Sequence, residues 1–154
     1  MIYFSGSEII EAAIQIEKNG YTFYRSLAES MDQKDIKDLF FHLATEEEKH
    51  IKNFEALCDS FKGYKPNNSD EEEYYAYIKS LSDRNVFTKK EGIDEIVKNV
   101  KGKEDALSMA MGFEKDSIIF FIEIRDLVKK SDRIAIDALI HQEREHLRKL
   151  IHVV

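Results

Sequence analysis

The chain contains long stretches in which apolar residues recur at alternating steps of three and four, the spacing of a helix that buries one face. The first stretch follows Ser5-Gly6-Ser7-Glu8, which has the spacing of a capping box at a helix start. It predicts a helix over residues 6–31. The same spacing predicts further helices over residues 34–61, 104–130 and 132–152.

The segment between the second and third of these helices, residues 63–103, has a different pattern. It holds the only proline, Pro66, and a turn and helix start at Asn67-Asn68-Ser69-Asp70. Two short helical patterns follow, Glu71–Leu81 and Ile93–Val100. We interpret it as a long crossover in which Tyr74, Tyr75 and Tyr77 are packing residues. The chain is therefore predicted to be all-α, a single domain over residues 1–154. Its architecture would be a four-helix bundle of ferritin-like topology, two antiparallel helix pairs joined by that crossover.

The composition is that of a soluble globular protein, with 43% hydrophobic and 34% charged residues in 154. A net charge of −7 argues against a nucleic-acid partner, which requires a basic surface. The single cysteine, Cys58, excludes an intrachain disulfide and a cysteine-rich metal site. No signal peptide or membrane-spanning run is visible, so we expect a cytoplasmic protein with no membrane partner.

Ionisable residues occupy positions in all four predicted helices where the spacing requires an apolar side chain. An isolated buried carboxylate costs several kcal/mol, and four of them would rival the stability of a whole domain, about 5–15 kcal/mol. No lysine or arginine shares these positions, so bound metal explains them best. The residues are Glu17, Glu47, His50, Glu114, Glu143 and His146.

These six residues are also predicted to lie at one depth in the bundle. The midpoint between the candidates of the first two helices falls at Asp32-Gln33, and that of the last two at Lys129-Lys130. Both midpoints lie within about two residues of the predicted breaks, or roughly 3 Å of helix rise. Each Glu-x-x-His pair shares one helix face. Two such pairs and two single glutamates can hold two metal ions and leave positions open for water or oxygen species.

The two halves of the chain repeat each other. Residues 13–24 read AIQIEKNGYTFY and residues 110–121 read AMGFEKDSIIFF, and LATEEEKHI at 43–51 matches LIHQEREHL at 139–147. Generic helix periodicity produces weak self-similarity, but it does not align Glu with Glu and His with His. We therefore favour duplication of a helix pair.

The order Glu, Glu-x-x-His, Glu, Glu-x-x-His resembles the ferritin-like di-iron carboxylate proteins. Within them it is most similar to the rubrerythrins, on Glu17-x6-Tyr24, Leu39–His50 and Ala106–Phe121. The resemblance implies that Glu47 and Glu143 bridge two metals, that Glu17 and Glu114 are terminal ligands, and that His50 and His146 complete one metal each. It also suggests a hydrogen bond from Tyr24 to a ligand; the alternative is a core tyrosine bound elsewhere.

Two features depart from the rubrerythrin pattern. Rubrerythrins usually carry a four-cysteine iron–sulfur domain, which this chain cannot form, so electrons would come from a separate donor protein. They also usually have an extra glutamate three residues after the third-helix ligand, linked to their peroxide chemistry. Here that residue is Ser117, which leaves a six-ligand set closer to the ferritin oxidation centre.

Three functions fit this reading. The first is an oxidoreductase whose two metal ions, iron or else manganese, react with peroxide or dioxygen. The second is a ferroxidase, iron-storage or metal-buffering protein of ferritin type, and the third is a structural bundle that holds an inert ion such as zinc. The resemblance further suggests a homodimer. His42, His141 and His152 lie outside the helical spacing of buried positions and are expected at the surface or facing a partner.

Overall fold

The computed structural model describes residues 6–62, 69–84 and 92–154, and it is helical with no strand in these ranges. The elements in chain order are α1 (Gly6–Ser30), α2 (Lys34–Ala56), α3 (Cys58–Phe61), α4 (Ser69–Arg84), α5 (Ile93–Lys98), α6 (Gly102–Arg125), the short 3₁₀ helix η2 (Lys130–Asp132) and α7 (Arg133–Val153). The prediction of an all-α helix bundle is confirmed.

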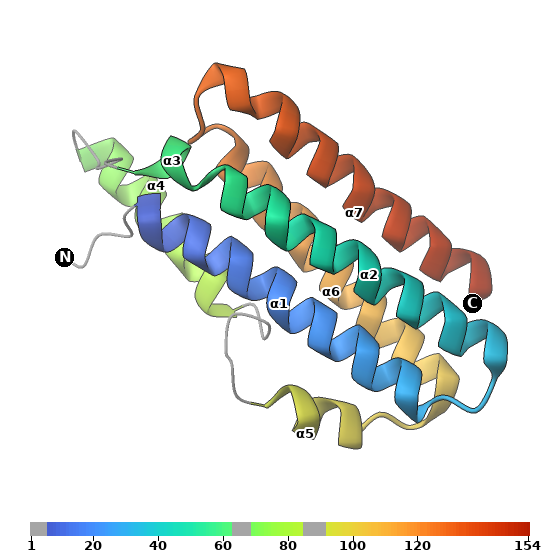
Figure 1. Cartoon of the computed structure of the whole chain (residues 1–154). Helices are drawn as coiled ribbons and strands as arrows, with labels where there is room; N and C mark the ends of the chain where they lie inside the picture. The colour runs from blue at the N-terminus through green and yellow to red at the C-terminus, as the bar shows by residue number, and fades with distance from the viewer. Residues whose placement is uncertain (1–5, 63–68, 85–91) are drawn as a thin grey trace.

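The four long helices α1, α2, α6 and α7 lie side by side along one axis (Figure 1). The turn between α1 and α2 lies at one end, and the connection between α6 and α7 lies at the opposite end (Figure 1). As a result α2 runs parallel to α6, and α1 runs parallel to α7. Contacts are densest within the pairs α1–α2 and α6–α7, while α4 packs on α6 and α5 packs on α1.

The bundle interior is apolar and strongly aromatic on both sides of one polar layer. On one side the ring of Tyr24 stacks on Phe40 at 6.0 Å between centroids and meets Phe113 edge-on at 5.8 Å. On the other side Phe54 and Phe121 lie 4.9 Å apart. All five rings are buried, so the polar layer between them is shielded from solvent along the bundle axis.

Two helix ends differ from the sequence prediction. The second helix is interrupted at Leu57, which separates α2 from α3, although apolar spacing continues to Phe61. The third helix ends at Arg125 and not at residue 130. Leu127 and Val128 continue the apolar spacing past that end, but they are buried from a turn. The apolar spacing indicates which residues are buried, and residues in a packed turn can continue that spacing as well as residues in a helix.

The crossover contains the two short helices that the sequence predicts, with shifted bounds. Helix α4 extends beyond the predicted 71–81 at both ends, and α5 ends at Lys98, two residues early. Tyr75 is buried, whereas Tyr77 is 44% exposed and Tyr74 donates a 2.6 Å hydrogen bond to the backbone oxygen of Glu123. The predicted turn at Asn67-Asn68 and the predicted cap residue Ser5 lie outside the described residues.

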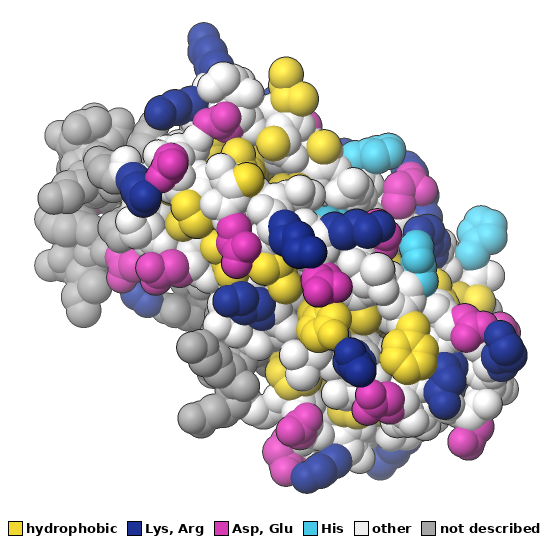
Figure 2. Space-filling model, viewed as in Figure 1, with side chains coloured by type: hydrophobic (Ala, Val, Ile, Leu, Met, Phe, Trp, Pro, Cys, Tyr) yellow, Lys and Arg dark blue, Asp and Glu magenta, His cyan; other side chains and the backbone are white. Residues whose placement is uncertain are grey.

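Charged side chains of both signs alternate over α1, α2 and α7 on the face shown in Figure 2. Many are exposed ion pairs one helical turn apart, such as Lys34 with Asp38 at 2.6 Å. Pairs of this kind contribute little to stability. Within the described residues, no helix is long and apolar enough to cross a membrane.

Candidate metal centre

The polar layer of the bundle is formed by carboxylates and imidazoles from all four long helices. Each of these residues is at most 1% exposed. Helix α1 provides Glu17, α2 provides Glu47 and His50, α6 provides Glu114, and α7 provides Glu143 and His146. The structure therefore brings together all six residues that the sequence singles out. That they bind metal stays a prediction for the individual residues.

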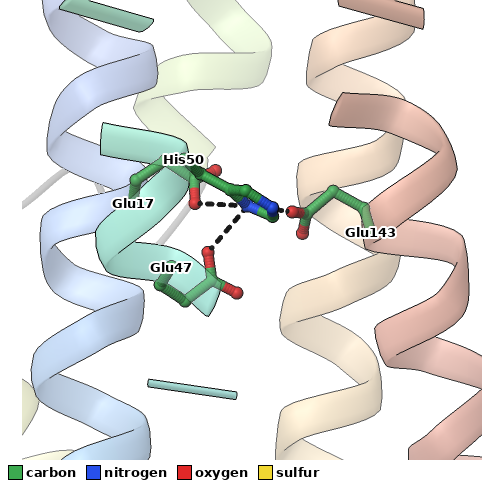
Figure 3. A group of neighbouring side chains, drawn as sticks. All are labelled: Glu17, Glu47, His50 and Glu143. Atoms are coloured by element: carbon green, nitrogen blue, oxygen red, sulfur yellow. Dashed lines mark hydrogen bonds and ion pairs between the residues drawn. The ribbon is translucent and has the colours of Figure 1, made fainter. Parts of the chain in front are cut away.

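Their ligand atoms form two groups that share two carboxylates. Glu17, Glu47, His50 and Glu143 each place a donor atom within 4.8 Å of the others, and so do Glu47, Glu114, Glu143 and His146. In Figure 3, Glu17, Glu47 and Glu143 converge on the ring of His50 from α1, α2 and α7. Glu47 and Glu143 belong to both groups, which is the geometry required of carboxylates that bridge two metal ions.

Both histidines face the carboxylates with the same ring nitrogen. Nδ1 of His50 lies 2.7 Å from a carboxylate oxygen of Glu143 and 3.3 Å from one of Glu17. Nδ1 of His146 lies 3.3 Å from Glu47 and 3.6 Å from Glu114. The two rings are stacked, with centroids 5.3 Å apart and planes 14° apart. Nδ1 is therefore the candidate metal-binding atom on each ring.

Several buried polar atoms of this layer lack a hydrogen bond of normal geometry among the described residues. They include both carboxylate oxygens of Glu47 and of Glu143, and Nδ1 of His146. Such atoms normally have partners in native proteins, because an unpaired buried polar group costs about 1–3 kcal/mol. All of them are good ligands for a divalent cation of borderline or hard character. The residues present therefore fit a pair of metal ions.

Burial and mutual repulsion disturb the protonation of the layer in the metal-free chain. Burial, with repulsion from neighbouring carboxylates, raises the pKa of Glu17 and of Glu114 well above the usual value. Burial alone would lower the pKa of His146, but its contacts with Glu114 and Glu47 outweigh burial and raise it to about 10. Without metal the layer therefore retains protons that metal ions would displace.

Tyr24 is the clearest outer contact of this layer. Its hydroxyl is fully buried and donates a hydrogen bond to a carboxylate oxygen of Glu114. Burial and the nearby Glu114 carboxylate raise the pKa of Tyr24 well above 10, so the phenol keeps its proton. Of the two alternatives left open by the sequence, the structure shows the hydrogen bond to a candidate ligand. Such a contact orients the carboxylate and tunes its basicity.

The other three histidines are exposed, as the sequence predicts. Nε2 of His42, on α2, accepts a 2.8 Å hydrogen bond from the ammonium group of Lys149, on α7. Within the described residues, neither candidate group includes any of them.

Comparisons with known proteins agree with this geometry. The family model described as Rubrerythrin matches residues 8–153, a range that contains the whole layer. The chain is also similar to a protein of known structure from Thermotoga maritima, described as a ferritin-like diiron-carboxylate protein. The TM-score is 0.72 and the identity 31%, over 99% of this chain and 95% of that chain. Among curated proteins the comparison found no match.

Proposed function

We propose that this chain, which belongs to the rubrerythrin family, is an oxidoreductase that uses two iron ions to react with peroxide or dioxygen. The observation that carries the proposal is the sharing of Glu47 and Glu143 between two buried ligand groups. Two shared carboxylates hold two ions close enough to deliver one electron each to the same oxidant. A purely structural role gives no reason for this layer, since apolar residues would stabilise the bundle as well or better.

The six residues of the polar layer would have different roles in binding the two ions. Glu17 and His50 would hold one ion, Glu114 and His146 the other, and the two shared carboxylates would link them. When bound, the iron pair supplies two electrons, which with two protons reduce one peroxide to two water molecules. The flanking rings of Phe40, Phe54 and Phe121 exclude bulk water from the layer, and Tyr24 holds the Glu114 carboxylate in place.

A separate protein would return the electrons. The chain has one cysteine, Cys58, and cannot form a four-cysteine iron–sulfur site. The proposed cycle is therefore oxidation of the iron pair by the substrate, followed by reduction by an external donor.

The experiment is stopped-flow mixing of protein loaded anaerobically with two Fe(II) ions per chain, against peroxide and against dioxygen in turn. We expect oxidation much faster than that of free Fe(II) in the same buffer, with the faster oxidant identifying the substrate. The substitution Glu143→Gln should abolish the acceleration. Glu145→Gln, two residues away on the partly exposed face where Glu145 pairs with Arg148, should not. A wild-type rate equal to that of free Fe(II) would refute the proposal.

One observation favours a second candidate, ferroxidation with iron storage. Ser117 stands where the resemblance to rubrerythrins places a further glutamate, and the six remaining ligands resemble the ferritin oxidation centre. Storage requires a large hollow shell of subunits. Light scattering of the iron-loaded protein distinguishes the two, because a monomer or dimer would exclude storage.

A further inference from the structure

Ser117 carries the one buried hydroxyl near the polar layer for which the described residues offer no hydrogen-bond partner. The side chain is 0% exposed and its Oγ is unpartnered. Hydroxyls in helices normally donate to a backbone oxygen three or four residues earlier. In this protein Thr22, Thr45 and Ser30 all do so. Burial of the Ser117 hydroxyl is therefore unfavourable, because no hydrogen bond within the described residues offsets the loss of hydration.

The position of Ser117 along the bundle is fixed by contacts on either side of it. Helices α2 and α6 are parallel, and the rings of Phe54 and Phe121 meet at 4.9 Å. One turn earlier on both helices stand His50 and Ser117, which places the serine at the depth of the polar layer. Ser117 also lies between the buried residues Glu114 and Phe121 at helical spacing, so it shares their inward face.

The internal repeat shows that a side chain is present at this position and absent at its counterpart. Ser117 matches Gly20, and Phe113 matches Ile16, at the same offset of 97 residues that relates Glu114 to Glu17. At Gly20 a Cβ atom would lie only 2.6 Å from Cζ of Phe113, so the phenylalanine ring fills that position. In the other half of the repeat the residue that matches Phe113 is the smaller Ile16, and Ser117 stands where the first half has Gly20.

From these observations, and resting on the proposed function, we propose that the Ser117 hydroxyl donates a hydrogen bond to a small non-protein ligand of the metal pair. The ligand class is a solvent molecule, hydroxide or a small anion seated between α1 and α6. Glu114, one turn away, and the matching Glu17 are candidate terminal ligands, so open metal positions would face this side. The serine would thereby set the affinity and orientation of whatever enters there.

Azide tests the proposal, because it is a small anion whose binding to ferric ions is followed by absorption. In protein loaded with two ferric ions per chain, Ser117→Ala should weaken azide binding about tenfold, the effect of losing one hydrogen bond to a charged group. Ser117→Cys, which keeps the size but is a weak donor, should weaken it similarly. Ser30→Ala, which removes a helix hydroxyl bonded to the Leu27 backbone oxygen, should leave it unchanged.

The melting temperature of the metal-free protein independently tests whether the Ser117 hydroxyl is bonded within the protein. Removing a hydroxyl that has no partner in the fold should leave the melting temperature of Ser117→Ala equal to or above that of the wild type. A lower value would show that the hydroxyl is already bonded within the protein, which would overturn the proposal.

Failure here is distinguishable from failure of the proposed function. If Ser117→Ala binds two irons and takes up azide as tightly as the wild type, only the role of the serine is wrong. If the wild type itself does not hold two irons, the proposed function fails.

Discussion

At the scale of single residues, the side chains of the polar layer are energetically unfavourable in the metal-free chain. Burial raises the pKa of Glu17 and Glu114, while both carboxylate oxygens of Glu47 and of Glu143 lack a hydrogen bond of normal geometry among the described residues. The proposed roles of these glutamates differ, because Glu17 belongs to one candidate ligand group and Glu47 to both. That difference can be measured.

Glu17→Gln should leave one metal ion per chain tightly bound, since the group around Glu114 and His146 stays complete. Glu47→Gln should weaken the binding of both ions, because it removes a donor from each group. Metal analysis after dialysis against a weak chelator checks both expectations. Glu48→Gln changes the neighbouring exposed residue and should retain two ions. Equal losses in the Glu17 and Glu47 variants would contradict the bridging role.

Tyr24→Phe removes the hydroxyl that donates to Glu114. We expect the free energy of unfolding of the metal-free protein to fall by about 1–3 kcal/mol, because a buried carboxylate oxygen loses its donor. Urea denaturation measures this. The control is Tyr21→Phe, which removes an exposed hydroxyl that accepts a hydrogen bond from Arg25 and should cost less than about 0.5 kcal/mol. Similar losses in both variants would show that the buried bond contributes nothing special.

At the scale of secondary-structure elements, the close approach of α1 and α6 depends on a missing side chain. A Cβ at Gly20 would lie 2.6 Å from Cζ and 2.9 Å from Cε1 of Phe113. The Phe113 ring has no easy retreat, since it packs against Phe23 at 6.3 Å and Tyr24 at 5.8 Å between ring centroids. Glycine is otherwise unfavourable inside a helix, so its presence here is a packing requirement.

Gly20→Ala should therefore destabilise the protein by about 1–3 kcal/mol through overpacking, despite the better helix propensity of alanine. Gly112→Ala is the matched control, because nothing lies within 4 Å of a Cβ at that helical position. It should stabilise the protein by about 0.5–1 kcal/mol. Thermal denaturation of the two variants should give shifts of opposite sign. A stabilised Gly20→Ala would mean that Phe113 can move aside.

The buried polar residues of the four long helices predict how these helices align, whereas the apolar spacing does not predict where each helix ends. The four long helices could be aligned from the sequence because each carries a buried glutamate, or a glutamate and a histidine, at the same depth in the bundle. The end of α6 could not be predicted, because Leu127 and Val128 are buried from a turn and continue the helical spacing. The sequence also could not predict that the Ser117 hydroxyl lacks a hydrogen-bond partner, since the spacing shows that a residue faces inward but not which atoms surround it.

At the scale of the whole molecule, metal and protons compete for the same layer. His146 has a pKa of about 10 in the fold against 6.5 ordinarily, so its stabilising effect is complete below pH 6.5 and is lost as the pH rises toward about 10. The raised pKa values of Glu17 and Glu114 act in the same direction above pH 4.5. Glu47, whose pKa is lowered despite burial by its contacts with Glu17 and the two histidines, acts oppositely and only in acid.

The metal-free protein should accordingly become less stable between pH 6.5 and about 10. The metal-loaded protein should lack this decline, because the bound ions already require deprotonated ligands. Melting temperatures of both forms across that range provide the measurement. A metal-free protein with a flat profile would show that the layer does not hold the extra protons.

Each helix pair contributes one carboxylate to the ligand group of the other pair, and this has a consequence for assembly. Each group takes three donors from its own helix pair and the fourth from the other: Glu143 reaches the α1–α2 side, and Glu47 reaches the α6–α7 side. Half of the molecule alone thus offers an ion an incomplete shell. During synthesis, the α1–α2 segment should therefore bind metal ions only weakly until the α6–α7 half has docked. Metal binding at both groups would then indicate that docking is complete.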